Sequence, residues 1–239
     1  MEKLNLEDFK LIVFDLDGVI LDISEAIRQS IQDSIDKYGI EVETDKIMGE
    51  IAILIEKLQC IPIPKIILNA KELLEVSFLE DQTVIKTLRI AAFIYSKFKE
   101  YKEKSGIYLG VDKIIRFLSA KNVKLAMLSN NKRTSVEQSL EKHDLKQYFL
   151  EILGANDTEK LKPEPDGLLK ILKDQSISNP SEVLFIGDMK TDVQAGKAAK
   201  IKTLCVASGL NNKEELLEEK PDFLVNNTQE LAEIFGISL

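Results

Sequence analysis

The sequence contains few of the side chains that usually build metal centres or acid–base pairs. Its 239 residues include two cysteines, Cys60 and Cys205, and one histidine, His143. Neither cysteine has a cysteine or histidine at ligand spacing, so we expect both to be buried apolar side chains in a reducing compartment. His143 stands beside Asp144 near the end of an expected helix, which favours a surface position. Any chemistry is therefore expected to use carboxylates and lysine.

Long apolar runs and an excess of positive charge are also absent. No run approaches the length of a membrane span, and no apolar stretch with a small-residue cleavage site follows the N-terminus. The formal net charge is -8, the pI is near 5.0 and the charges are interspersed, which argues against a nucleic-acid surface. We expect a cytoplasmic protein that binds neither membrane nor nucleic acid. Its hydrophobic content of 44% is ample for one large core or two modest ones.

The most informative stretch is Phe14 to Val19, where two acids follow a short apolar run. Residues 11–14 are predicted to form a buried strand, because the run is brief, rich in branched side chains and soon followed by a glycine. If the strand geometry continues, Asp15 and Asp17 point to the same side. Asp is depleted in strands and two close like charges disfavour ionisation, so the pair indicates a cation or a transferred proton. The alternative is a loop that begins with two solvated acids.

Residues 23–104 have the periodicity of helices. Apolar side chains recur at three- and four-residue steps over residues 27–38, with Gly39 as a stop and Asp22 or Ser24 as a possible N-cap. Three further apolar segments follow: a broken one at 51–58 and helical patterns at 66–78 and 84–98. We interpret the block as an all-helical domain whose apolar stripes form its own core.

From Gly106 onward, short apolar runs alternate with amphipathic segments. The expected strands are 123–128, 151–153, 183–186, 203–206 and 223–225, and the expected helices are 111–118, 133–142, 165–173, 191–199, 214–219 and a closing one around 231–235. Strands that alternate with helices predict an α/β fold with a doubly wound, parallel, Rossmann-like sheet. We assign residues 1–22 and 105–239 to this core, and residues 23–104 to a helical domain inserted after the first strand.

Three predicted strands end in polar residues, at the edge where open parallel sheets bind ligands. These residues are Asp15 and Asp17 after the first strand, Ser129 and Asn130 after the second, and Gly187 and Asp188 after the fourth in chain order. Lys162 lies in a loop that enters a helix, where Pro163 restricts its backbone. We expect these groups to converge on one site.

Each of these residues also has an ordinary structural interpretation. Ser129 and Asn130 could cap the following helix, a role that is compatible with phosphate binding. Lys162 could be a solvated loop charge. Asp192, four residues after Asp188, could be a first-turn acid favoured by the helix dipole. Taken together, the motifs indicate a functional site more specifically than any one of them does alone.

In their order and spacing, these motifs resemble those of the haloacid dehalogenase (HAD) superfamily. The matching segments are Asp15-Leu16-Asp17-Gly18-Val19, Ser129-Asn130, Lys162-Pro163, and Gly187-Asp188 with Asp192. The resemblance covers residues 8–22 and 105–236. Residues 110–235 look most like the phosphoglycolate phosphatase and pyrophosphatase-like branch, in which a helical cap domain occupies the place of residues 23–104.

The resemblance implies a Mg²⁺-dependent phosphatase that acts on a small phosphorylated metabolite. Asp15 would attack phosphorus and form an aspartyl-phosphate, and Asp17 would serve as general acid and then as general base. Mg²⁺ would be bound by the Asp15 carboxylate, the Asp17 backbone carbonyl and the Asp188 carboxylate.

The remaining motif residues would assist these three. Lys162 would add positive charge, while the Ser129 hydroxyl and the Asn130 backbone amide would hold phosphate oxygens. Asp192 would orient Lys162 or a metal-bound water.

Four positions depart from the family pattern. Asn131 stands where a lysine is often found, and Met189 stands where a small residue is often found. Asn122 and Lys200 precede strands at places where glycine is common. Asparagine tolerates a left-handed backbone, whereas lysine there would cost about 1 kcal/mol.

Other functions stay open on the sequence alone. A phosphomutase of the β-phosphoglucomutase type is the main alternative, in which a sugar hydroxyl rather than water takes the phosphoryl group. A non-catalytic binding protein is disfavoured because Asp15, Asp17, Lys162 and Asp188 are all present. A dehalogenase would not need Asp17, and a phosphonatase would need a cap lysine that no feature singles out. We expect a monomer or a homodimer.

Overall fold

The computed structural model describes residues 4–60, 83–207 and 213–239. The chain divides into two compact units, Met1–Asp22 with Ile107–Leu239, and Ile23–Gly106. The helical pattern predicted at 66–78 lies outside the described residues, as does the side chain of Cys60.

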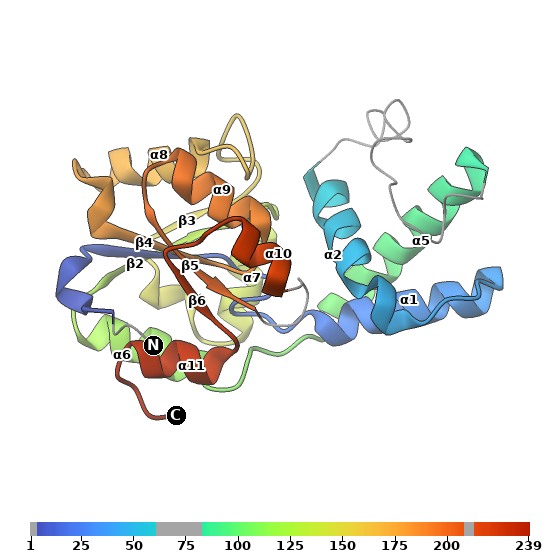
Figure 1. Ribbon diagram of the computed structural model, residues 1–239, viewed down its shortest axis with the longest axis horizontal. Helices are drawn as coiled ribbons and strands as arrows, with labels where there is room; N and C mark the ends of the chain where they lie inside the picture. The colour runs from blue at the N-terminus through green and yellow to red at the C-terminus, as the bar shows by residue number, and fades with distance from the viewer. Residues whose placement is uncertain (1–3, 61–82, 208–212) are drawn as a thin grey trace. The chain divides into compact units, whose positions relative to one another are not determined.

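The first unit is built on a six-stranded sheet in which every neighbouring pair is parallel (Figure 1). Its strands are β1 (Leu11–Phe14), β2 (Lys124–Leu128), β3 (Glu151–Leu153), β4 (Val183–Gly187), β5 (Lys202–Val206) and β6 (Phe223–Val225). Their order across the sheet is β3-β2-β1-β4-β5-β6, which is that of a doubly wound Rossmann-like fold. The predicted fold class is confirmed.

Helices cover both faces of this sheet. They are α6 (Val111–Ala120), α7 (Arg133–Lys142), α8 (Asp166–Asp174), α9 (Lys190–Ala198), α10 (Lys213–Glu218) and α11 (Thr228–Ile234), with 3-10 turns η1 (Leu6–Asp8), η3 (Lys146–Tyr148) and η4 (Pro180–Glu182). Figure 1 shows α8 and α9 on one side of the sheet and α6 and α11 on the other. The predicted helices of this unit are all present, with small shifts of their ends.

The strands are continuous apolar runs because a parallel sheet that is covered on both faces buries nearly every strand side chain. All four side chains of β1 are inaccessible to solvent. Val13 lies opposite Ala126 of β2 and Phe185 of β4, and these three side chains share one cluster with Leu168 of α8 and Ala195 of α9. This packing fixes the carboxyl end of β1 between those of β2 and β4.

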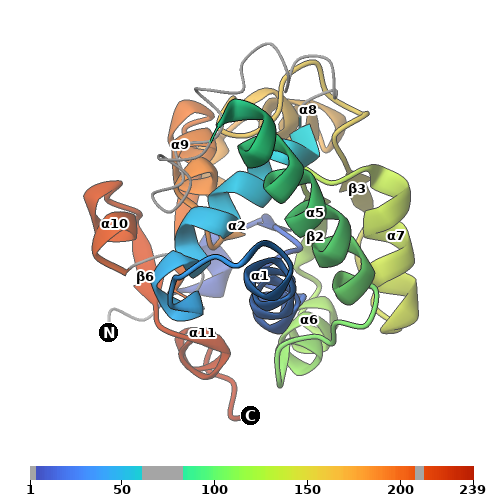
Figure 2. The same cartoon turned by 90° about the vertical axis from the view of Figure 1, so that its right-hand side faces the viewer.

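The described part of the second unit consists of helices α1 (Ser24–Tyr38), α2 (Thr44–Cys60) and α5 (Val84–Lys102) (Figure 2). Helices α1 and α5 pack together, and their buried apolar residues include Ile27 and Ile31 of α1 with Ile90, Ile94 and Phe98 of α5. Gly39 ends α1, as predicted, and its backbone is in the left-handed conformation, with φ 62°.

Two details of the helical unit differ from the prediction. Residues 51–58 were expected to be broken, but α2 runs through them, because Ile51, Leu54 and Ile55 lie at helical spacing and are buried. The N-cap of α1 is Ile23, not Asp22 or Ser24, and no side-chain hydrogen bond caps the helix. Ile23 is buried, so packing rather than a polar cap sets the start of α1.

Asn122 and Lys200 both have left-handed backbones, with φ 59° and 60°. Each follows a helix and precedes a strand, at the positions where the sequence suggested a glycine-like conformation. The predicted strain at Lys200 is therefore present in the fold.

Cys205 lies on β5 and is buried, as expected. Burial raises the pKa of its thiol, so the side chain is an unreactive apolar group. None of the helices described is long and apolar enough to cross a membrane.

Candidate active site

The carboxyl ends of β1, β2 and β4 lie side by side and carry several of the predicted site residues. Asp15 follows β1, so it lies between Ser129, which follows β2, and Asp188, which follows β4. The sheet ladder continues past these strand ends: the Asp15 N–H donates to the Ile186 carbonyl at 2.8 Å, and the Ser129 N–H donates to the Leu153 carbonyl at 3.1 Å. The side chains of Asp15, Ser129 and Asp188 are buried.

Lys162 reaches two carboxylates from different loops. Its Nζ lies 3.1 Å from Asp15 Oδ1 and 2.5 Å from Asp192 Oδ1. Only 7% of Lys162 is exposed, which rules out the solvated loop charge that the sequence allowed. A buried ammonium is tolerated where carboxylates compensate its charge, and both of these partners are themselves buried. The Lys162–Pro163 peptide bond is cis.

Asp192, in the first turn of α9, also fixes the loop after β4. Its Oδ2 accepts hydrogen bonds from the backbone N–H groups of Asp188, at 3.0 Å, and Met189, at 2.9 Å. Gly187 permits this close approach, because a Cβ at that position would overlap the Asp192 side chain. Asp192 is thus both a first-turn acid and a partner of Lys162.

The side-chain amide of Asn130 pairs with both backbone groups of Lys162. Asn130 Nδ2 donates to the Lys162 carbonyl at 3.2 Å, and Asn130 Oδ1 accepts from the Lys162 N–H at 3.1 Å. Sequence reasoning gave Asn130 a backbone role in phosphate binding, with a helix cap as the alternative. The side-chain pairing was missed because the two residues are 32 positions apart and no local pattern links them.

Asn131 joins Asp17 to Ser129, a contact that sequence reasoning also missed. Asn131 Nδ2 donates to Asp17 Oδ2 at 2.8 Å and to Ser129 Oγ at 3.1 Å. The Asn131 backbone N–H donates to the same Ser129 oxygen at 3.2 Å. One feature of the sequence pointed to Asn131: asparagine stands at this position, where the family often has lysine.

The site concentrates buried negative charge. Asp15, Asp188 and Asp192 each offer a carboxylate oxygen, and these oxygens lie within 4.8 Å of one another. Burial is the main cause that raises the pKa of Asp15 to about 7; the Lys162 ammonium opposes the rise, while Asp192 and Asp17 add to it. Buried oxygen ligands with excess negative charge suit a hard divalent cation.

Two of the three carboxylates are better placed than the third to hold such a cation. Both oxygens of Asp192 already accept hydrogen bonds from protein groups, so Asp192 is suited to a supporting role. Asp15 and Asp188 are the remaining candidates. Gly18, with φ 76°, allows the loop after β1 to lie against Asp188, because a Cβ at Gly18 would overlap the Asp188 carboxylate.

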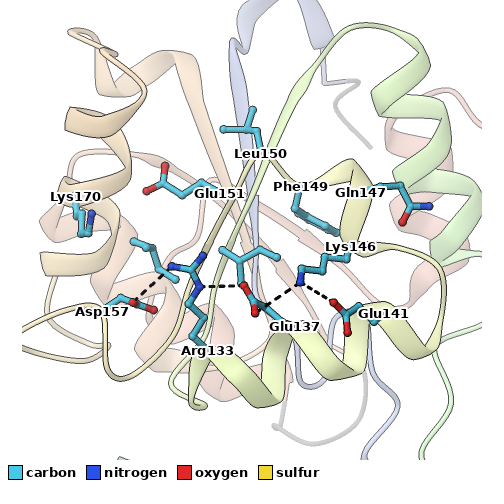
Figure 3. Close-up of a pocket in the computed structure, with 12 residues that line it drawn as sticks. Arg133, Glu137, Glu141, Lys146, Gln147, Phe149, Leu150, Glu151, Asp157 and Lys170 are labelled. Atoms are coloured by element: carbon cyan, nitrogen blue, oxygen red, sulfur yellow. Dashed lines mark hydrogen bonds and ion pairs between the residues drawn. The ribbon is translucent and has the colours of Figure 1, made fainter.

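A surface pocket of about 660 Å³ lies elsewhere on this unit, along β3 and beside α7 and α8 (Figure 3). Several of its charged side chains pair with one another: Arg133 Nε lies 3.0 Å from Glu137 Oε1, and Lys146 Nζ lies 2.6 Å from Glu141 Oε1. None of the predicted site residues lines this pocket. We therefore place the candidate active site at the strand ends and not here.

The chain belongs to the haloacid dehalogenase-like hydrolase family, whose model matches residues 12–206. The match begins in β1 and ends with β5, so it contains every residue of the site at the strand ends.

Individual relatives are similar along most of their length. A phosphoglycolate phosphatase of Pseudomonas fluorescens is 24% identical over 227 residues, which cover 93% of this chain and 78% of that protein. A solved structure from Lactobacillus delbrueckii subsp. bulgaricus, provisionally assigned as a phosphoglycolate phosphatase, aligns with a TM-score of 0.70 at 20% identity and covers 94% of this chain and 97% of that one. A Thermotoga maritima structure, provisionally assigned as a β-phosphoglucomutase, aligns with a TM-score of 0.65 at 22% identity. The alignment covers 96% of this chain and 100% of that one. At these identities the structural likeness shows the fold.

Proposed function

We propose that the protein is a Mg²⁺-dependent phosphatase that hydrolyses a small phosphorylated metabolite, with 2-phosphoglycolate as the first candidate substrate. The observation that carries the proposal is the buried Asp15 carboxylate, 3.1 Å from the Lys162 ammonium at the carboxyl end of β1. A carboxylate can attack an anionic phosphate only where nearby positive charge offsets the repulsion. The family and the phosphatase among the relatives support the same reaction class.

The proposed reaction consists of two displacements at phosphorus. In the first, an Asp15 carboxylate oxygen bonds to phosphorus, the bond from phosphorus to the alcohol oxygen breaks, and Asp17 gives its proton to that oxygen. In the second, Asp17 takes a proton from water, the water oxygen bonds to phosphorus, and Asp15 is released together with inorganic phosphate. Asp17 thereby returns to its starting protonation state.

The phosphate would be held by groups from the loops after β2 and before α8. Ser129 Oγ accepts two hydrogen bonds from Asn131, so its own proton is available to a phosphate oxygen. The Asn130 side chain is engaged with Lys162, so Asn130 would contribute its backbone amide. Lys162 would contribute positive charge beside Asp15.

The residues present fit a bound Mg²⁺. The Asp15 and Asp188 carboxylates and the Asp17 backbone carbonyl would hold it, and Asp192 would support them through Lys162 and the loop after β4. When bound, the cation supplies positive charge that reduces the repulsion between Asp15 and the phosphate. We assign residues 1–22 and 105–239 to the catalytic domain, and residues 23–104 to a cap domain that selects the substrate.

The test is an assay of the purified protein with p-nitrophenyl phosphate and a panel that includes 2-phosphoglycolate, pyrophosphate and hexose phosphates. We expect release of inorganic phosphate with Mg²⁺ and none with a chelator. Asp15→Asn should lower turnover by about 10³-fold or more, because the nucleophile is lost. Asp8→Asn, at an exposed acid in η1 before β1, is the matched control and should leave turnover unchanged. Normal turnover by Asp15→Asn would exclude the nucleophile assignment.

The same panel separates hydrolysis from a mutase reaction. A phosphomutase would share the first displacement at Asp15 but would return the phosphoryl group to a sugar hydroxyl. Isomerised hexose phosphate without release of inorganic phosphate would identify the mutase, whereas release without isomerisation supports the phosphatase.

Binding of Mg²⁺ can also be measured without substrate. A ligand that binds only the folded state raises the free energy of unfolding, by about 2.7 kcal/mol at roughly 100 times its Kd. We expect Mg²⁺ to raise the midpoint of thermal unfolding, and Asp188→Asn to remove that shift. An unchanged shift in Asp188→Asn would remove Asp188 from the ligand set.

A further inference from the structure

We propose that Asn131 is a positioning residue for Asp17, which gives its proton to the leaving oxygen in the first displacement. The inference rests on the proposed phosphatase function and adds a residue to it. Asp17 belongs to the loop after β1 and Asn131 to the loop after β2, 114 residues further along the chain. The strands β1 and β2 are neighbours in the sheet, which brings the two loops together.

The contacts determine which way the Asn131 amide faces. Its Nδ2 lies 2.8 Å from Asp17 Oδ2 and 3.1 Å from Ser129 Oγ, so one amide nitrogen serves two oxygen acceptors. With the amide reversed, its oxygen would face a carboxylate oxygen, and two acceptors at that distance repel. The backbone N–H of Asn131 donates to Ser129 Oγ at 3.2 Å, which holds the residue in place.

This arrangement orients the Asp17 carboxyl group. Because Asp17 Oδ2 accepts the hydrogen bond from Asn131, the proton that Asp17 gives to the leaving oxygen is carried by Oδ1. Without Asn131, Asp17 Oδ2 loses the donor that orients it, and proton transfer to the leaving oxygen becomes rarer.

A loss of proton transfer lowers kcat/KM more for esters with a basic leaving oxygen than for esters with a good leaving group. A general loss of structure lowers both equally. An ester with a good leaving group, such as p-nitrophenyl phosphate, departs as the anion and needs little protonation. Phenyl phosphate has nearly the same shape but a much more basic leaving oxygen, so it depends on the general acid. The ratio of the two kcat/KM values reports on the first displacement alone, because both substrates give the same aspartyl-phosphate afterwards.

The experiment measures kcat/KM for both esters, with Mg²⁺, in the wild type and in Asn131→Ala, Asn131→Gln and Asp17→Asn. In Asn131→Ala we expect a loss of about 10²-fold for phenyl phosphate and less than about 3-fold for p-nitrophenyl phosphate. Asn131→Gln keeps an amide donor on a longer side chain and should recover part of the ratio. Thr134→Ala, at an exposed uncharged position in the first turn of α7, is the control and should change neither value.

The outcomes separate this inference from the proposed function. Equal losses for the two esters in Asn131→Ala, or no loss for either, would overturn the role of Asn131 while leaving the phosphatase intact. If Asp17→Asn also lacks the leaving-group effect, the general-acid assignment itself is wrong. A wild type that hydrolyses neither ester would overturn both proposals. Circular dichroism of each variant establishes that the losses are measured on folded protein.

Discussion

Lys162 Nζ lies 2.5 Å from Asp192 Oδ1, and the other oxygen of the same carboxylate accepts backbone hydrogen bonds from Asp188 and Met189. One side chain therefore holds both the lysine and the loop that follows β4. Lys162 in turn lies 3.1 Å from Asp15 Oδ1. The proposed nucleophile and a proposed metal ligand are thus coupled through Asp192.

Asp192→Asn should impair both stability and activity. An amide at this position can offer its oxygen to Lys162 or to the two backbone N–H groups, but not to both, and its NH₂ group then faces a donor. Breaking one partner of a buried ion pair typically costs about 3 kcal/mol, which we expect in urea unfolding. Turnover of p-nitrophenyl phosphate should fall by more than about 10-fold because Lys162 and Asp188 lose their positions.

The control for Asp192→Asn is Asp174→Asn. Asp174 forms an ion pair with Lys170 within α8, but both side chains are well exposed. Exposed pairs of this kind contribute little, so neither unfolding nor turnover should change measurably. Equal effects of the two substitutions would show that Asp192 has no special role.

Asn130→Ala should release the backbone of Lys162. The substitution removes two hydrogen bonds and leaves a buried N–H and a buried carbonyl without their amide partner, which is expected to cost about 2 kcal/mol of unfolding free energy. Because Lys162 then loses its fixed direction toward Asp15, kcat/KM should fall about 10-fold or more. Asn179→Ala, which removes an exposed cap of η4, is the control and should leave kcat/KM unchanged. A normal kcat/KM in Asn130→Ala would mean that the amide only stabilises the loop.

Local sequence patterns were sufficient for the core sheet and for part of the site. The strands of the core are continuous apolar runs, and Asp15, Ser129 and Asp188 each come directly after one of them, so a parallel sheet had to bring them to one edge. Helix α2 was not recognised as continuous, because a helix packed by Ile51 and Ile55 tolerates an irregular pattern elsewhere.

The contacts between site residues could not be predicted from local sequence patterns. The pairing of Asn131 with Asp17 depends on β2 lying beside β1, and that order is a property of the whole sheet. The pairing of the Asn130 amide with Lys162 depends on where an irregular loop passes. In both cases the sequence analysis singled out the residues but could not predict which side-chain atoms are in contact, because these contacts form only when distant segments pack.

Lys200→Gly should stabilise the protein. Lys200 has φ 60°, a conformation that costs an L-residue roughly 1 kcal/mol and costs glycine little. Glycine also loses more backbone entropy on folding, so the expected net gain in chemical unfolding is about 0.5 kcal/mol. Lys121→Gly is the matched control: Lys121 has φ -84°, and glycine there should destabilise the protein. A loss of stability in Lys200→Gly would contradict the strain assigned to that position.

Asp222, which lies outside the candidate active site, should make the free energy of unfolding depend on pH. Its Oδ2 accepts from the Thr203 N–H at 2.9 Å, and its Oδ1 accepts from Lys202 Nζ at 2.6 Å. Partial burial acts to raise the pKa of Asp222, but the hydrogen bonds from Lys202 and Thr203 outweigh it and hold the pKa below its usual value.

A lowered pKa in the folded state means that the ionised carboxylate stabilises the fold at neutral pH. That contribution is fully present above the unfolded pKa of about 3.9 and is lost as the pH falls through the folded pKa. We expect Asp222→Asn to lower the free energy of unfolding by about 1 kcal/mol at pH 7, a value reduced by the partial exposure of the pair. The difference between wild type and variant should hold down to about pH 5 and shrink below about pH 4 in urea titrations. A difference that grows as the pH falls would have the wrong sign for a carboxylate held in its ionised form.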